Sequence, residues 1–129
     1  MIVVDSSVWI AHLRNSESRA VRALRALQPP DEILIGDVIL LEVLQGARNE
    51  QHAAEIESNL RQFRMERMLD DELAARAARH YRTMRERGTT IYKTIDLIIA
   101  TFCIERGHQL LHEDRDFDRI AAHLNLQTI

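Results

Sequence analysis

Four acidic residues stand where the neighbouring sequence is apolar or marks the end of a strand. Asp5 directly follows the β-branched run of residues 2–4, and Asp114 comes shortly after an apolar pair. Glu42 interrupts one aliphatic segment, and Asp96 precedes another. Because burying an unpaired carboxylate is costly, each of these acids requires a partner or a shared cation.

Each acid taken singly also has an ordinary structural interpretation. Asp5 can cap the helix that follows it, and Asp96 can interact with a helix dipole. Glu42 can pair with an arginine of a neighbouring helix, and Asp114 can be solvated in its acidic loop. These interpretations stay open for single residues, whereas the shared placement of all four indicates one site.

Convergence of these carboxylates would require a cation. Two carboxylates about 5 Å apart repel each other by roughly 3 kcal/mol at an effective dielectric of about 20. An all-oxygen ligand set, without cysteine or suitably spaced histidine, favours a hard ion such as Mg²⁺ or Mn²⁺. Such an ion binds phosphates and lowers the pKa of a bound water. The residues therefore predict phosphodiester hydrolysis.

Short apolar strands that alternate with helices must position these acids. The pattern predicts strands at residues 2–4, 33–35, 63–68, 110–111 and 126–129. Ser6 or Ser7 is expected to cap the first helix, and Thr94 the apolar helix that carries Asp96. This alternation predicts a single α/β domain over residues 1–129, whose mostly parallel sheet is covered on both faces. Ligands bind such sheets beyond the carboxyl ends of the strands, where the acids are expected.

The composition is that of an ordinary globular chain of 129 residues, 46% hydrophobic and 29% charged, with a net charge of −3. No apolar run reaches the roughly 20 residues of a membrane span, and the first residues lack the pattern of a signal peptide. Cys103 is the single cysteine. An internal disulfide is thereby excluded, which is typical of a reducing cytoplasm.

Four segments around the acids occur in the order and spacing of a known family. Residues 3–10, 41–46, 94–101 and 110–117 resemble the PIN domain, and more closely the VapC-type ribonuclease toxins of bacterial toxin–antitoxin pairs. The resemblance covers essentially the whole chain. Each segment alone is a loose match, and the ordered set makes the resemblance specific.

The resemblance implies a three-layer α/β/α sandwich with a parallel sheet in strand order 3-2-1-4-5. It also implies metal-dependent endoribonuclease activity that leaves a 5′ phosphate, with Mg²⁺ or Mn²⁺ as the cofactor. A cognate antitoxin protein, a homodimer and a cytoplasmic location away from membranes are further implications. The residues that match the family's catalytic, metal-binding acids are Asp5, Glu42, Asp96 and Asp114, with Asp116 as a frequent fifth acid and Ser7 as a supporting polar residue.

Two residues near the site have alternative interpretations. His112 stands where many relatives carry threonine or serine, two residues before the acid that Asp114 matches. It can contact phosphate or metal, although a supporting or exposed position is favoured. Trp9 can dock a partner, but a role as the core anchor of the first helix is favoured.

Arginine supplies sixteen of the seventeen basic residues. Its planar guanidinium suits phosphate, although a genome rich in G and C would enrich arginine equally well. Two helices carry arginines at a spacing of three, with few acids to compensate them. The resulting candidates for RNA contact are Arg19, Arg22 and Arg25 on one helix and Arg79, Arg82 and Arg85 on another. A solvated charged face is the alternative.

Other function classes fit the sequence less well. A receiver-type signalling domain needs an aspartate after a middle strand, and none lies between Asp37 and Asp70. A haloacid-dehalogenase-type phosphatase needs two aspartates one residue apart after the first strand, where this chain has Asp5-Ser6-Ser7. A PIN-like module that binds RNA or protein without catalysis remains the alternative, because fold alone does not imply activity.

Overall fold

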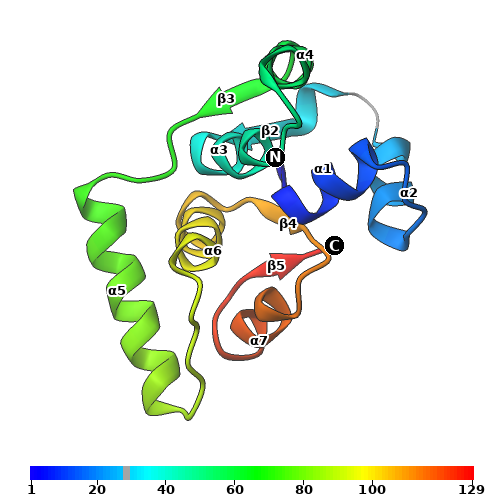
Figure 1. Ribbon diagram of the computed structural model, residues 1–129. Helices are drawn as coiled ribbons and strands as arrows, with labels where there is room; N and C mark the ends of the chain where they lie inside the picture. The colour runs from blue at the N-terminus through cyan, green and yellow to red at the C-terminus, as the bar shows by residue number, and fades with distance from the viewer. Residues whose placement is uncertain (28–29) are drawn as a thin grey trace.

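The computed structural model describes residues 1–27 and 30–129. Its strands form one sheet (Figure 1): β1 (Ile2–Val4), β2 (Ile33–Gly36), β3 (Arg64–Glu66), β4 (Gln109–Leu111) and β5 (Gln127–Thr128). The α-helices are α1 (Ser6–Leu13), α2 (Arg19–Ala26), α3 (Asp37–Gln45), α4 (Glu50–Leu60), α5 (Asp71–Glu86), α6 (Thr94–Arg106) and α7 (Arg115–His123). A short 3₁₀ helix, η1 (Pro30–Glu32), precedes β2.

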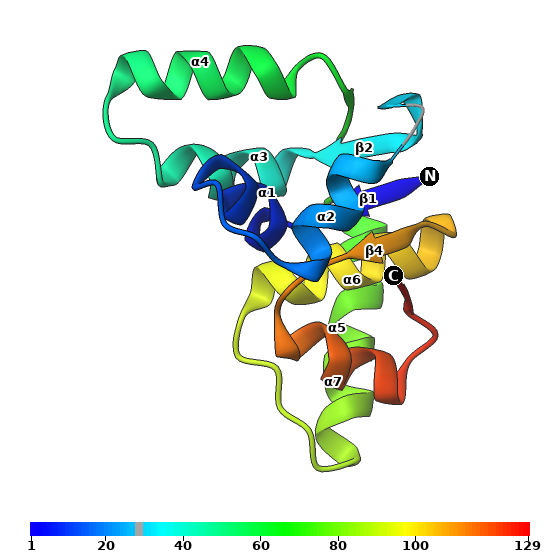
Figure 2. The same ribbon diagram turned by 90° about the vertical axis from the view of Figure 1, so that its right-hand side faces the viewer.

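The strand order in the sheet is β3-β2-β1-β4-β5, and every neighbouring pair is parallel. Residue contacts group α1 with α2 and α3, and α6 with α5 and α7. Figures 1 and 2 show α5 and α6 to one side of the sheet and α1 and α2 to the other. The predicted α/β class, the three-layer sandwich and the strand order 3-2-1-4-5 are confirmed.

The centre of the sheet is buried because its strands carry almost only aliphatic side chains. Val3, Val4, Leu34 and Ile35 have no exposed surface. Helix α6 packs against α5, α7 and β4, and its residues from Asp96 to Cys103 are all buried. An apolar helix in such a position has no solvent face, so the acid in its first turn is buried with it.

The starts of two helices concern the site. Of the caps that the sequence offered for α1, Asp5 is the N-cap rather than Ser6 or Ser7, because the residue that leaves β1 already has the extended backbone that a cap requires. The two serine hydroxyls are thereby free to bind other groups. Lys93, rather than Thr94, is the N-cap of α6, and its side chain makes no capping hydrogen bond.

The start of α3 lies close to the end of β3. Gly36 ends β2, pairs with Glu66 of β3 and precedes Asp37, whose Oδ1 accepts hydrogen bonds from the backbone N–H groups of Val38 and Met68. This junction fixes where α3 begins, and α3 carries Glu42.

Within the described ranges, no helix combines the length and the apolar character needed to cross a bilayer.

Candidate metal centre

Three acids from two helices present carboxylate oxygens to one another. Asp96 lies in the first turn of α6, Asp114 is the N-cap of α7, and Asp116 lies in the first turn of α7. One oxygen from each lies within 4.8 Å of the others. In the part of the chain that the structure describes, this is the one group of three or more acidic, histidine or cysteine side chains spaced to hold a metal ion. Asp116, expected only as an additional acid, is thus a member of the tightest group.

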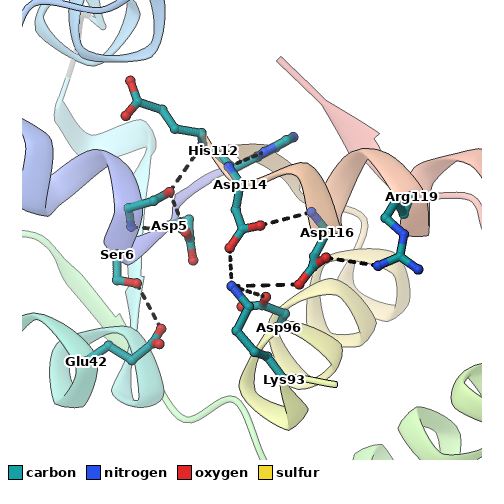
Figure 3. Close-up of polar contacts among 11 residues, drawn as sticks. Asp5, Ser6, Glu42, Lys93, Asp96, His112, Asp114, Asp116 and Arg119 are labelled. Carbon is teal, nitrogen blue, oxygen red and sulfur yellow. Dashed lines mark hydrogen bonds and ion pairs between the residues drawn. The ribbon is translucent and has the colours of Figure 1, made fainter. Parts of the chain in front are cut away.

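Asp5 approaches this group from the end of β1 (Figure 3). It is 3% exposed, and its Oδ2 accepts hydrogen bonds from Ser7 Oγ at 2.6 Å and from the Ser7 backbone N–H at 3.0 Å. Its Oδ1 is buried and receives no hydrogen bond from the described residues. Burial raises the pKa of Asp5, the Ser7 hydrogen bonds partly offset this, and the charge of Asp114 raises it further. Ser7 therefore holds one oxygen of Asp5 and leaves the other available to a ligand.

Glu42 approaches from α3 and is not part of the group of three. Its Oε1 accepts a hydrogen bond from Ser6 Oγ at 2.9 Å. Burial raises the pKa of Glu42, the Ser6 hydrogen bond lowers it, and the negative charge of Asp5 raises it again. Ser6 was expected only as a helix cap. Its position next to Asp5 in the first turn of α1 was the available indication of a role in the site.

Asp96 has a strongly shifted pKa. The residue is 4% exposed, and its Oδ2 receives no hydrogen bond from residues 1–27 or 30–129. Burial is the main cause that raises the pKa of Asp96, to about 6, and the charges of Asp5 and Asp114 act in the same direction. The ammonium of Lys93 opposes this shift without cancelling it.

Lys93 places its ammonium among the three grouped acids (Figure 3). Nζ lies 3.3 Å from Asp96 Oδ2 and 3.7 Å from Asp116 Oδ2, and it donates a hydrogen bond to Asp114 Oδ2. The hydrogen bond to Asp114 is the largest cause of a raised Lys93 pKa. Sequence reasoning missed this residue. The available signal was that the single lysine stands three residues before Asp96, a spacing at which helical side chains meet.

Asp114 is held ionised by its neighbours. Burial alone would raise its pKa, but hydrogen bonds from Lys93 and from the Asp116 backbone N–H, together with the Lys93 charge, bring the pKa of Asp114 below its usual value. Asp116 in turn pairs with Arg119, whose Nη1 lies 3.2 Å from Oδ1 on the outer side of the group. Within the group of three, Asp114 and Asp116 therefore have cationic partners that offset their charge. The charge of the buried Asp96 is only partly offset by Lys93.

The loop that carries Asp114 is fixed to α1 and to its own helix. The Glu113 backbone N–H donates to Ser7 Oγ at 3.2 Å, and the Asp114 backbone N–H donates to His112 Nδ1 at 3.2 Å. The His112 ring packs on Phe117, with 5.2 Å between ring centroids. Its Nε2 lies 3.5 Å from Asp118 rather than near the grouped acids. His112 thus supports the loop.

The other singled-out residues lie outside the acid group. Trp9 is 4% exposed and packs on Phe63, with 5.4 Å between ring centroids, so its predicted role as a core anchor is confirmed. The six candidate arginines are all exposed. Arg19 lines a hollow of about 480 Å³ together with His112 and Arg115, next to the Asp114 loop. On the opposite layer, Arg82 borders a groove that reaches Thr94 at the start of α6.

The donor set fits a hard divalent cation. Every donor is a carboxylate oxygen, which is the ligand type that Mg²⁺ and Mn²⁺ prefer. Asp5 Oδ1 is buried and receives no hydrogen bond from the described residues, and Asp96 Oδ2 has there an ion pair with Lys93 at 3.3 Å but no hydrogen bond. A buried acceptor without a hydrogen bond is costly, which favours a ligand or water at this point. The arrangement can therefore hold an ion between the end of β1 and the starts of α6 and α7.

A family model and a curated relative of known name assign this chain to the same family. The family model described as "PIN domain" matches residues 2–123. VapC ribonuclease Mb1587 of Mycobacterium bovis is 33% identical over 130 aligned residues, which cover 98% of this chain and 96% of the relative. Among solved structures, VapBC2 from Rickettsia felis bound to a promoter DNA fragment has a TM-score of 0.77 at 20% identity, covering 100% of this chain and 98% of that one. A toxin–antitoxin complex from Klebsiella pneumoniae has a TM-score of 0.70 at 19% identity, covering 89% of this chain and 88% of that one.

Proposed function

The chain belongs to the PIN-domain family, and from this premise we propose that it is a metal-dependent endoribonuclease, the toxin of a toxin–antitoxin pair, acting as a single domain. The observation that carries the proposal is the convergence of carboxylates from β1, α6 and α7 around two buried oxygens that lack hydrogen-bond donors in the described chain. The curated relative of 33% identity, a VapC ribonuclease, supports the same reaction.

Mg²⁺ is the proposed cofactor, with Mn²⁺ as a substitute. Asp5, Asp96 and Asp114 would hold the ion, and Asp116 is a further ligand. When bound, a divalent ion supplies charge that stabilises the negative phosphate oxygens of the transition state and lowers the pKa of water. The buried Oδ1 of Asp5 supports this assignment, because it receives no hydrogen bond from the described residues. Asp96 Oδ2 supports it as well, because its ion-pair partner within the described chain is the exposed ammonium of Lys93 at 3.3 Å.

Glu42 is the proposed proton acceptor. Ser6 Oγ binds Oε1, so Oε2 is left to take a proton from the attacking water. A general base works best when its pKa lies close to the working pH, and the pKa of Glu42 is raised in that direction by burial. Ser6 and Ser7 are positioning residues, since each holds one carboxylate by one oxygen.

RNA is the proposed substrate, and exposed arginines beside the acids are the proposed phosphate contacts. The α2 arginines are favoured by the hydrogen bond from Ser18 to Glu113, which joins the start of α2 to the Asp114 loop. Arg25 is partly neutralised by Glu17 at 2.8 Å, so Arg19 and Arg22 are the stronger candidates of this stripe. Arg79, Arg82 and Arg85 lie on α5 in the opposite layer, and of these Arg82 lines the groove that reaches Thr94 at the start of α6.

A cognate antitoxin is the proposed protein partner, as in the toxin–antitoxin complex from Klebsiella pneumoniae that shares this fold. The groove between α1, α3 and α4 offers a mixed surface for a peptide segment, with apolar side chains such as Ile10 and Val43 beside the polar side chains of Arg14, Arg48 and His52. A homodimer is also proposed, and the apolar groove between α5 and α6 offers a face for a second copy. The buried thiol of Cys103 and an RNA substrate support a cytoplasmic location.

An RNA cleavage assay on the full chain tests the proposed function. Wild-type protein is expected to generate 5′-phosphate ends with Mg²⁺ and none in a chelator. Asp114→Asn should reduce the cleavage rate at least about a hundredfold, because it removes one of the charges that hold the ion. Glu55→Gln is the control for the loss of one negative charge, since this α4 side chain is exposed and lies outside the acid group, and it should cleave like wild type. Binding of RNA without cleavage by every variant would instead indicate a non-catalytic module.

A further inference from the structure

The ammonium of Lys93 lies where the proposed metal ion would have to lie. Nζ contacts Asp114 and lies 3.3 Å from Asp96 Oδ2 and 3.7 Å from Asp116 Oδ2, so it faces an oxygen of each acid in the group. We propose that Lys93 is a tethered counter-cation that occupies the metal position in the metal-free protein and must be displaced before a divalent ion binds. This inference rests on the proposed function, because it assumes that the acid group is a metal site.

The geometry makes the two cations mutually exclusive. Mg²⁺ binds carboxylate oxygens at about 2.0–2.1 Å, so an ion shared by the grouped acids must lie between their oxygens. Those oxygens lie within 4.8 Å of one another, and the Lys93 ammonium already lies among them. A divalent ion and an ammonium cannot occupy this space together, both for steric reasons and because like charges repel.

The Lys93 side chain can move away from the three acids. It is 56% exposed, and Lys93 stands at the N-cap of α6 without a capping hydrogen bond. The lysine stem is flexible and a free ammonium is strongly hydrated, so solvent can replace the contacts that Lys93 makes with the acids. The three carboxylates keep other contacts when it leaves. Asp96 lies in the buried helix, the Asp114 loop is held by hydrogen bonds to Asp116 and His112, and Asp116 pairs with Arg119.

No other cation in the described residues reaches the interior of the group. Arg119 contacts Asp116 from the outer side, and the ion pair of Asp96 is made by Lys93 alone among residues 1–27 and 30–129. One substitution at Lys93 therefore has two opposite effects. It removes the partner of a buried carboxylate, which destabilises the metal-free protein, and it removes a competitor, which tightens metal binding.

Calorimetric titration of the metal-free full chain with Mn²⁺ tests the inference. Lys93→Met should lower the Kd for Mn²⁺ by roughly tenfold, which corresponds to about 1.4 kcal/mol for three partly exposed ion pairs. Arg115→Met is the matched control, because Arg115 is exposed, adjacent to Asp114, and makes no ion pair within the described chain. It should change the Kd less than about threefold, since it removes only a long-range charge. Lys93→Arg, which restores a competing cation, should bind Mn²⁺ nearly as weakly as wild type.

Two outcomes separate this inference from the proposed function. If Asp96→Asn abolishes Mn²⁺ binding while Lys93→Met binds no more tightly than wild type, the metal site stands and the role of Lys93 is overturned. If Asp96→Asn binds Mn²⁺ as wild type does, the acid group is not the metal site, and both proposals fall. A purely structural role for Lys93 would lower the metal-free melting temperature of Lys93→Met without tightening the Kd.

Discussion

Individual acids in this site differ in how their charge is accommodated. Asp114 is surrounded by donors, and its pKa lies below the usual value, whereas burial raises the pKa of Asp96 to about 6. Asp5 and Glu42 share this upward shift for the same reason, and each is stabilised by one serine hydroxyl. Burial therefore makes the ionised carboxylates of Asp5, Glu42 and Asp96 unfavourable for the stability of the metal-free fold.

The difference in stability between wild type and Asp96→Asn should depend on pH. Asp96 has a pKa of about 6 when folded and 3.8 in its reference state, so between these values the folded protein binds more protons than the unfolded chain. Its contribution therefore destabilises the fold progressively as pH rises from about 4 to about 6, and fully above that. Asp96→Asn should be more stable than wild type by about 1–3 kcal/mol at pH 8 and about equal to it at pH 4.

Urea unfolding in a chelator at both pH values measures this difference. Subtracting the two proteins cancels the titration of all groups that they share. If the difference in unfolding free energy is constant with pH, or favours wild type at pH 8, ionisation of Asp96 does not destabilise the fold.

Among the elements, the junction of β2 and α3 controls where Glu42 lies. Gly36 has an ordinary negative φ, so its backbone conformation does not require glycine. Space requires it, because a Cβ at this position would overlap the side chain of Met68, which is 1% exposed. The backbone N–H of Met68 also donates a hydrogen bond to Asp37 Oδ1 at 3.0 Å, so Met68 helps to fix the start of α3.

Gly36→Ala should destabilise the protein by about 1–3 kcal/mol through overpacking. Shortening the neighbour should relieve part of this cost, so Gly36→Ala combined with Met68→Ala should be less destabilised than the sum of the two single variants. Urea unfolding of the four proteins at one pH gives the coupling energy. Additive losses would mean that the two positions do not compete for the same space.

Elements were easier to predict from the sequence than contacts. The strands around Val3 and Leu110 follow from apolar runs, and Asp5 and Asp114 follow from their places at strand ends. The caps predicted at Ser6 or Ser7 and at Thr94 lie one or two residues after the observed caps, because local propensity does not specify which hydroxyl is needed elsewhere. Lys93 could not be placed among the acids from sequence, since a flexible side chain at a helix start has several directions open to it.

The whole molecule has a net charge of −3, and its acidic site lies at one edge of the sheet. Arginines occur on both helical layers, on α2 and on α5, so periodicity alone could not distinguish the stripe that lies beside the site. The sheet order did follow from the family resemblance, and it is the order that brings β1 beside β4 and hence Asp5 toward Asp114. The proposed function depends on a divalent cation at that edge of the sheet.

Anomalous X-ray scattering from crystals of the full chain grown with Mn²⁺ tests this central claim most directly. The predicted result is one strong manganese peak about 2.2 Å from carboxylate oxygens of Asp96 and Asp114, with the Lys93 ammonium withdrawn from the group. A peak bound elsewhere, or Lys93 still seated among the acids at saturating Mn²⁺ with no peak beside it, would contradict the account.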